Sequence, residues 1–372
     1  MGFDADASAT TSKPNGLLRS LPATLFPVEL DGVAGVLSQN RTLHVFGHDL
    51  ADRTFKRISI VPDGGLTQQT LRKISSLDHP ILPQRCNGKI QVLKSFPGPG
   101  NRWQLLTLDP QLARHGAQPI PTPSGFGFLI PLLRCDGRNT WIIWNLSNET
   151  RVQLRRTGEK TVTHRLPPRR GGSRSHVSPQ LRVEAWKNRL CLLRSSTQGI
   201  EAILVGATGE LRRSLLSAKG SLHLAMTRVG QRLLVVWVRS GRKRTRFMGR
   251  TSQIVGRWLD KNLRPLGNTQ VFAKRTETGN VQLHLWSNAN NQLVMGRTVR
   301  IPRRLRGGGH RYHITSHITR YDVARRPRGA WLAVGESAIS HGKWIGDTLF
   351  LVMGSQLTRP KRIHVHVRRF RF

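Results

Sequence analysis

The sequence is poor in acidic residues, tyrosine and cysteine, and it contains no long hydrophobic run. Of its 372 residues, 20 are acidic, 2 are tyrosine and 3 are cysteine. Its longest apolar runs, Phe128–Leu133 and Leu233–Val238, have the length of a strand. A transmembrane helix needs roughly 18 apolar residues, so the sequence predicts no membrane-spanning helix.

The N-terminal segment lacks the features of a targeting signal. Asp4 and Asp6 stand where a secretory leader needs basic residues, and no apolar core follows them. We expect residues 1–19 to form a disordered tail and residues 20–372 to form a single domain. The sequence indicates a soluble protein of undetermined compartment and oligomeric state, and a leader already removed from this chain stays an open alternative.

The cysteines do not form a recognisable framework. Cys86, Cys135 and Cys191 are odd in number and far apart, which fits neither a set of disulfides nor the spacing of a zinc site. Each lies in or beside an apolar run. The sequence therefore predicts three buried thiols, and we expect neither a metal nor a cofactor.

Motifs of several large enzyme classes are also missing. There is no P-loop and no GxGxxG, and Gly335–Ile339 (GESAI) lacks the second glycine of a nucleophile elbow. No pattern ties Tyr312 or Tyr321 to a glutamate, as a sialidase-like site would require. The acidic residues are scattered, so no glycosidase pair stands out. We expect a protein that is not an enzyme and assign no catalytic residue; an exported carbohydrate-active enzyme is a further alternative.

What the sequence does contain is a repeated phrase of strand, tight turn and strand, clearest in Ile254–Phe272. Similar turns recur with a mean spacing of about 49 residues, which is the period of propeller blades. These turns lie at Asp63, Asp109, Thr157, Thr208, Asp260, Gly308 and Ser355.

A second set of turns, rich in Asn and Gly, runs in phase with the first. Asn and Gly tolerate the positive φ that tight hairpins require. The segments that contain these turns are Val36–Phe46, Gln84–Leu93, Leu132–Trp144, Val183–Leu193, Leu224–Trp237, Leu283–Met295 and Arg325–Val334. The two sets together predict units of four strands, here called a, b, c and d in chain order.

These units predict an all-β fold, a β-propeller of seven four-stranded blades, because closure into a ring hides the sheet edges. A six-bladed ring and a pair of β-sandwiches are the alternatives. In this phase Ile363–Phe370 is a final d strand, so no blade would combine the two termini. Inner or middle strands should bury Trp186, Val235, Trp237, Leu285 and Leu332.

The units resemble the loosely repeated propellers of bacterial surface and secreted proteins. The resemblance lies mainly in the phrase Ile254–Gly267 and in a few residues of each other unit. It implies a repeat scaffold and identifies no site residue.

Positive charge is the strongest functional signal. The chain carries 60 basic residues, mostly arginine, and a formal net charge of +40. Such a field attracts polyanions, including nucleic acid and acidic polysaccharide. The alternative is that the charge is only a matter of composition.

Two arginine-rich connections are predicted to share one face of the ring. They are the b–c loop Arg239–Arg250 and the d–a connection Leu166–His176, whereas Arg303–Arg311 is assigned to a c–d turn on the opposite face. Arginine forks pair with phosphate oxygens, and the scarcity of aromatic residues favours contacts to the nucleic-acid backbone. The candidate polyanion-binding residues are Arg169, Arg170, Arg174, Arg242, Lys243, Arg244 and Arg246.

The sequence therefore predicts a non-catalytic binding scaffold whose basic loop face holds a polyanion. Nucleic acid is favoured over acidic polysaccharide, and protein partners are left open. The alternative is a structural or surface propeller whose charge has no binding role.

Overall fold

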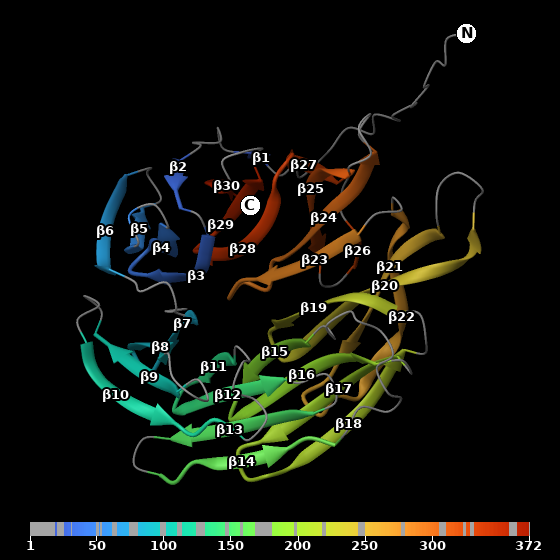
Figure 1. The fold of residues 1–372 in the computed structure, drawn as a ribbon. Helices are drawn as coiled ribbons and strands as arrows, with labels where there is room; N and C mark the ends of the chain where they lie inside the picture. Colours follow the sequence, from blue (N-terminus) through green and yellow to red (C-terminus); the bar gives the residue numbers. More distant parts are fainter. Residues whose placement is uncertain are drawn as a thin grey trace.

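Seven antiparallel sheets surround a common axis in the computed structural model of the chain (Figure 1). The structure describes residues 19–20, 26–30, 32–49, 52, 54–61, 65–73, 81–96, 102–109, 114–123, 131–145, 149–156, 159–167, 181–196, 199–217, 221–244, 250–276, 280–304, 310–322, 325–327, 331–356 and 363–371. The regular elements formed by these residues are all strands, which confirms the predicted all-β propeller of seven blades. Nowhere among them does a helix occur that could cross a membrane.

The blades follow one another along the chain, each beginning with its innermost strand. Blade one contains β3 (Gly32–Gln39), β4 (Thr42–Asp49), β5 (Thr54–Ile60) and β6 (Leu66–Lys73). Blade two contains β7 (Ile81–Cys86), β8 (Lys89–Phe96), β9 (Arg102–Leu108) and β10 (Arg114–Ile120). Blade three contains β11 (Leu132–Asp136), β12 (Asn139–Asn145), β13 (Thr150–Arg156) and β14 (Val162–Arg165). Blade four contains β15 (Leu181–Trp186), β16 (Arg189–Ser196), β17 (Gly199–Gly206) and β18 (Leu211–Ser217).

The last three blades include the longest strands. Blade five contains β19 (Ser221–Val229), β20 (Arg232–Arg244), β21 (Arg250–Leu259) and β22 (Pro265–Thr276). Blade six contains β23 (Asn280–Ser287), β24 (Leu293–Arg304), β25 (His310–Asp322) and, at its outer edge, β26 (Arg325–Pro327) and β27 (Leu332–Gly335). Blade seven contains β28 (Ala338–Ile345), β29 (Thr348–Gln356) and β30 (Ile363–Arg371), completed by β1 (Arg19–Ser20) and β2 (Phe26–Glu29).

The two kinds of turn found in the sequence have clear local causes. Asn87 and Gly88 join β7 to β8 with φ values of 50° and 75°, the left-handed conformation that Asn and Gly tolerate. At the turn between β21 and β22, the Asp260 carboxylate accepts hydrogen bonds from the backbone N–H groups of Asn262 and Arg264, each at 2.8 Å. Leu263 turns inward there and is 2% exposed.

The predicted strand phase is confirmed for blades one to five and wrong for blades six and seven. Arg303–Arg311, assigned to a c–d turn, instead spans the connection between β24 and β25. Arg325–Val334, assigned to the start of the last blade, supplies outer strands that pair with β25. The long β24 and β25 stretch blade six, so a fixed period of about 49 residues misplaces everything after them.

Ring closure also differs from the prediction. β30 is the third strand of blade seven, and it pairs with β29 on one side and with β1 and β2 on the other. In the register, Val28 lies opposite Val365 and Arg19 opposite Arg371. Figure 1 shows the C-terminus beside β1. Backbone hydrogen bonds between the two ends of the chain therefore close the ring, in addition to packing between blades.

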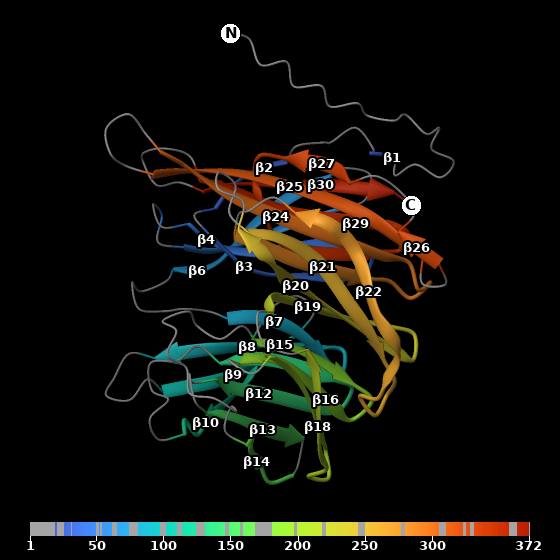
Figure 2. The same cartoon turned by 90° about the vertical axis from the view of Figure 1, so that its right-hand side faces the viewer.

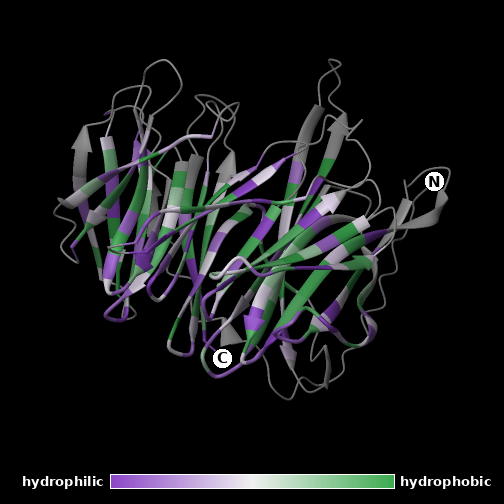
Figure 3. Cartoon of the chain, turned by 90° about the horizontal axis from the view of Figure 1, so that it is seen from below, coloured by the Kyte–Doolittle hydropathy of each residue, from purple (hydrophilic) through white to green (hydrophobic). Residues whose placement is uncertain are grey.

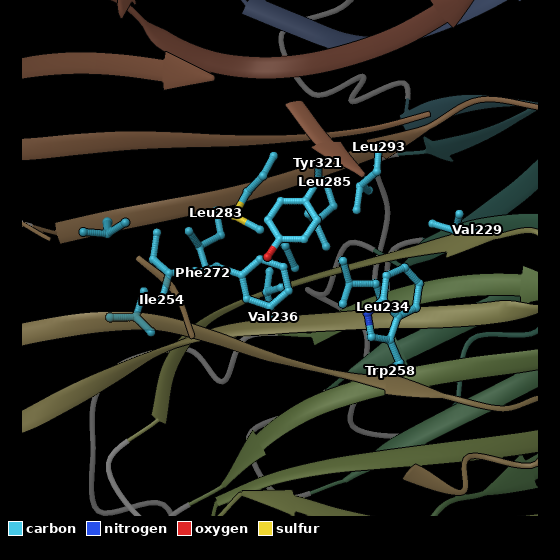
Figure 4. Packing of buried hydrophobic residues seen from close by; sticks show 14 of the residues in the cluster. Val229, Leu234, Val236, Ile254, Trp258, Phe272, Leu283, Leu285, Leu293 and Tyr321 are labelled. Atoms are coloured by element: carbon cyan, nitrogen blue, oxygen red, sulfur yellow. The ribbon is translucent and has the colours of Figure 1, made fainter. Parts of the chain in front are cut away.

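The core is divided among the interfaces between blades. Seven buried apolar clusters occur in the described residues, one at each of the seven interfaces. Figure 4 shows the cluster between blades five and six, where the rings of Phe272 and Tyr321 lie 4.5 Å apart. Apolar and polar residues alternate along many strands in Figure 3, because a strand sends successive side chains to opposite faces.

The predicted core residues are buried with one exception. Trp186, Val235, Trp237 and Leu285 are 3%, 0%, 2% and 9% exposed. Leu332 is only partly buried, so this prediction is wrong. It lies on β27 at the outer edge of blade six because of the phase error described above.

The structure contradicts the prediction of three thiols. Cys86 and Cys135 form a disulfide, with their Cα atoms 5.5 Å apart, and only Cys191 is a buried free cysteine. The two bonded cysteines are 49 residues apart in the chain, so they occupy corresponding places on the inner strands of neighbouring blades. The repeat brings together residues that look unrelated in the sequence.

Candidate functional site

The predicted polyanion-binding residues lie in or beside connections between strands. Arg169, Arg170, Arg174 and Arg246 lie outside the described residues. Arg242, Lys243 and Arg244 lie near the end of β20, where the chain leaves the second strand of blade five. Topology places the end of β20, the end of β14 and the start of β15 on the same face of the ring, because successive strands of a blade are antiparallel. We call this side the loop face and the opposite side the turn face.

The corrected phase moves a third basic segment to the loop face. Arg303–Arg311 includes the ends of β24 and β25, which pair with Arg303 opposite Arg311. Their connection is therefore of the b–c type, like that between β20 and β21 in the neighbouring blade. The sequence-based prediction for this segment was wrong because it assumed a constant repeat length, whereas β24 and β25 are long.

A second group of candidate side chains lies on the innermost strands, and the sequence analysis did not identify it. The strands β11, β15, β19, β23 and β28 surround the axis of the ring (Figure 1). Their charged and imidazole side chains interact electrostatically with one another and form what we call the axial cluster. The members of the axial cluster are Arg134, Arg182, Glu184, His223, Arg228, His284, His341 and Lys343.

Two arginines of the axial cluster are held in the same way by neighbouring blades. Arg134 on β11 donates from Nε to the carbonyl oxygen of Val183 at 3.0 Å and from Nη1 to that of Leu133 at 2.8 Å. Arg182 on β15 donates from Nε to the carbonyl oxygen of Leu224 at 2.9 Å and from Nη1 to that of Leu181 at 3.2 Å. Each guanidinium thus bridges to the inner strand of the next blade.

Glu184 is the one carboxylate that acts on these cations among the described residues. Burial raises its pKa, whereas Arg134, Arg228 and Lys343 lower it. No cation of the described chain lies within ion-pair distance of the Glu184 carboxylate. Several positive groups therefore act on this carboxylate, but none of them forms an ion pair with it. Lys343 has an exposed side chain. Its pKa is nevertheless lowered, mainly by desolvation and also by Arg134, while Glu184 acts in the opposite direction.

The histidines near the axis are held neutral. Burial, with help from Arg182 and His341, lowers the pKa of His284 to about 3. Burial, with help from Arg134, lowers the pKa of His341 to about 4. The ring of His284 stacks on Trp286 at 5.4 Å, and Trp286 fits closely against Gly342, where a Cβ atom would collide with the indole.

The low pKa values of His284 and His341 predict that mild acid destabilises the fold. Between about pH 6.5 and 4.5 the histidines of the unfolded chain become protonated, whereas His284 and His341 of the folded protein stay neutral. The unfolding free energy should therefore decrease as the pH is lowered through this range. Each shifted histidine contributes a slope approaching 1.4 kcal/mol per pH unit, on the order of the full linkage value. Urea unfolding at a series of pH values measures this slope.

The raised pKa of Glu184 acts in the opposite direction, because it favours the folded state as the pH falls toward 4.5. The variant His341→Gln serves as the comparison, since Glu184 is present in both proteins. Its slope between pH 6.5 and 4.5 should be shallower than that of the parent. Identical slopes would contradict a neutral, protected His341.

A separate polar cleft of about 700 Å³ lies between blades two and three. Lys89, Arg138, Arg155 and Arg156 contribute to its wall, together with Glu159. Two of these cations already have partners: Arg155 donates to the carbonyl of Pro119 at 2.9 Å, and Arg156 pairs with Glu159 at 3.0 Å. The wall of the cleft therefore carries four cations and one carboxylate, and one of the cations is paired with that carboxylate.

A simple sequence signal marks the axial cluster in retrospect. Inner strands alternate buried apolar residues with charged ones, as in Leu181, Arg182, Val183 and Glu184. The alternation predicts half-buried strands, but only the ring places several such strands around one axis. No group of three or more His, Cys, Asp or Glu side chains suited to a metal ion occurs among the described residues.

Comparisons with known proteins support the fold and nothing finer. No protein-family model matches the chain, and no curated protein matches it. The structure of polysaccharide lyase Uly1 is similar with a TM-score of 0.52 and 8% identity, covering 91% of this chain and 89% of that one. A protein from Lactobacillus plantarum also gives 0.52, with 11% identity and coverage of 89% and 99%.

The β-propeller domain of the Trilobed protease from Pyrococcus furiosus is similar with a TM-score of 0.46 and 8% identity, covering 78% of this chain and 82% of that domain. At such low identities the likeness concerns the fold alone. The polysaccharide lyase is an enzyme with this fold, so the fold by itself does not separate catalytic from binding roles.

Proposed function

We propose that this propeller is a non-catalytic binding protein that holds a polyanion, preferably nucleic acid, on its loop face. The observation that carries the proposal is topological. Three arginine-rich segments, Leu166–His176, Arg239–Arg250 and Arg303–Arg311, begin at the ends of β14, β20 and β24, and these three strand ends lie on one side of the ring. Blades five and six, which carry two of them, are neighbours.

The chemistry of these segments favours backbone recognition. They are rich in arginine, whose planar fork matches two phosphate oxygens at once. They contain Phe247 but no aromatic series on which successive bases could stack. Contacts to phosphate position a nucleic acid without reading its sequence, so we expect binding that is largely independent of sequence.

The hairpin ends of the long strands β20, β21, β24 and β25 extend from the body of the ring in Figure 1 and Figure 2. Arg242, Lys243 and Arg244 lie at such an end. A polymer can therefore reach these positions without entering the ring.

A salt titration with a matched control tests the proposal. In the test variant, the seven candidate residues become Ser: Arg169, Arg170, Arg174, Arg242, Lys243, Arg244 and Arg246. In the control, seven exposed basic residues on or beside turns of the turn face become Ser: Arg41, Lys89, Arg138, Lys160, Arg232, Lys261 and Arg264. Both variants lose the same formal charge, so only the location differs.

We expect the parent to bind mixed-sequence nucleic acid with an affinity that falls steeply with salt, because phosphate binding releases counterions. The test variant should bind at least about tenfold more weakly at 100 mM salt and show a flatter salt slope. The control should lose less in both respects. Fluorescence anisotropy, with melting curves for all three proteins, gives the readout.

Two results would count against the proposal. Equal losses in the test and control variants would mean that total charge, rather than the loop face, attracts the polymer. A parent that does not bind at moderate salt would favour the alternative that the charge is compositional and the propeller is structural. If the parent binds an acidic polysaccharide more tightly than nucleic acid, the loop face remains the proposed site but its ligand is the polysaccharide.

A further inference from the structure

We infer that the axial cluster is a second binding site, which takes a compact tetrahedral oxyanion such as the phosphate or sulfate group of a small molecule. This site is independent of the loop face. It lies on the inner strands of blades three to seven, and Arg134 and Arg182 are its central cations. The inference rests on how these arginines are held, on the charge balance at the axis and on polar atoms that lack partners.

The first argument is the preorganisation of the two guanidinium groups. Backbone carbonyls fix Nε and Nη1 of Arg134 and of Arg182. In the described chain, Nη2 of each has no partner. A guanidinium that is already clamped loses little further freedom on binding a ligand. The two groups come from adjacent blades and interact electrostatically, and each offers a donor that is already oriented.

The second argument is the excess of positive charge near the axis. Arg134, Arg182, Arg228 and Lys343 act on one another or on Glu184, which is their one acidic neighbour among the described residues. Neighbouring charges of one sign in a partly desolvated place oppose folding unless a counter-charge is bound. A dianion at this place would remove most of the excess.

The third argument is that solvent and ligand can reach the cluster. The side chains of Arg134, Arg182 and Glu184 are only partly buried, although they lie on the innermost strands. Arg228 and Lys343 are exposed near the ends of β19 and β28 that lead into the a–b turns. The approach is therefore from the turn face, on the opposite side from the loop face.

The fourth argument comes from two imidazole atoms. Nε2 of His284 and Nδ1 of His341 are buried and have no hydrogen-bond partner in the described part of the chain. Buried polar atoms without partners are rare and call for an explanation. Both rings interact electrostatically with the arginines of the cluster, so an anion between the arginines would also act on them.

The geometry favours a tetrahedral oxyanion over a single carboxylate. One guanidinium fork satisfies a carboxylate, whereas two separate arginines can share the three or four oxygens of phosphate or sulfate. Glu184 already supplies one carboxylate near Arg134 and leaves the excess charge in place. The ligand must therefore bring more than one negative charge or more than two acceptor oxygens.

Calorimetric titration with inorganic phosphate and with inorganic sulfate tests the site. At pH 8 and low salt we expect the parent to bind at least one of them. The double variant Arg134→Gln, Arg182→Gln should bind at least about tenfold more weakly, because two charge-assisted contacts are lost. The control Arg138→Gln, an exposed residue at the turn between β11 and β12, should bind like the parent.

A second variant gives an effect of opposite sign. Glu184→Gln removes the carboxylate that repels an anion, so it should bind phosphate or sulfate more tightly than the parent, by roughly threefold or more. This result keeps the site testable even if the double variant does not fold. A carboxylate with a purely structural role would give unchanged or weaker binding.

The loop-face variant described above separates the two proposals. The loop-face variant should bind phosphate or sulfate like the parent even if its affinity for nucleic acid is lost. The double variant Arg134→Gln, Arg182→Gln should keep its affinity for nucleic acid. Binding of phosphate alone or of sulfate alone identifies the source of the oxyanion, and either supports the site. No binding of either ion by the parent, or equal binding by the double variant, would overturn it.

Discussion

Replacing Val235 with Asp is expected to unfold the protein or to reduce its unfolding free energy by at least about 4 kcal/mol. Val235 is fully buried on β20, in the cluster between blades four and five that also includes Leu204 and Val255. A carboxylate in this apolar cluster must either stay charged at a high cost or take up a proton. Chemical denaturation of parent and variant measures the loss.

The matched control is Val271→Asp. Val271 lies on β22, the outer strand of blade five, and is 43% exposed. The same change should cost little there, within about 0.5 kcal/mol to 1 kcal/mol for an exposed strand position. A Val235→Asp variant that melts like the parent, or a control that is equally damaged, would contradict the strand assignment of blade five.

Removing the N-terminal strands is expected to open the ring. A chain that starts at residue 32 loses β1 and β2, which pair with β30, and it loses Leu30, which is 2% exposed in the cluster between blades seven and one. Loss of one buried leucine and of several net backbone hydrogen bonds amounts to about 5 kcal/mol. The exposed edge of β30 should also promote association between molecules.

A chain that starts at residue 19 is the control, because it keeps both strands. Its unfolding midpoint should equal that of the full chain, whereas the shorter chain should unfold at lower denaturant and elute as larger species in size-exclusion chromatography. Equal midpoints for the two truncations would mean that packing between blades alone closes the ring.

Local chemistry made most of the fold predictable. Turns such as Asn87–Gly88 and the one held by Asp260 depend on residues within a few positions of each other. The Asn/Gly turns and the Asp turns therefore predicted seven blades of four strands. The assignment of Val235 and Trp237 to the second strand of a blade likewise predicted their burial, because a middle strand is covered on both faces.

Errors arose where strand length or distant pairing decided the outcome. A constant period carried the phase correctly through blade five but failed at the long β24 and β25, so Arg303–Arg311 was placed on the wrong face. Pairing of β30 with β1 and β2 joins the two ends of the chain, and no local pattern encodes such a register.

The sequence by itself determined that this chain is an all-β propeller with an arginine-rich surface, because turn residues, alternation and charge are local properties. Only the tertiary structure decided how the ring closes, that Cys86 and Cys135 are bonded, and that Arg134, Arg182 and Glu184 meet near one axis. These features depend on residues about a blade or more apart being brought together. Closure of the ring fixes those distances, and a single unit of the repeat does not contain them.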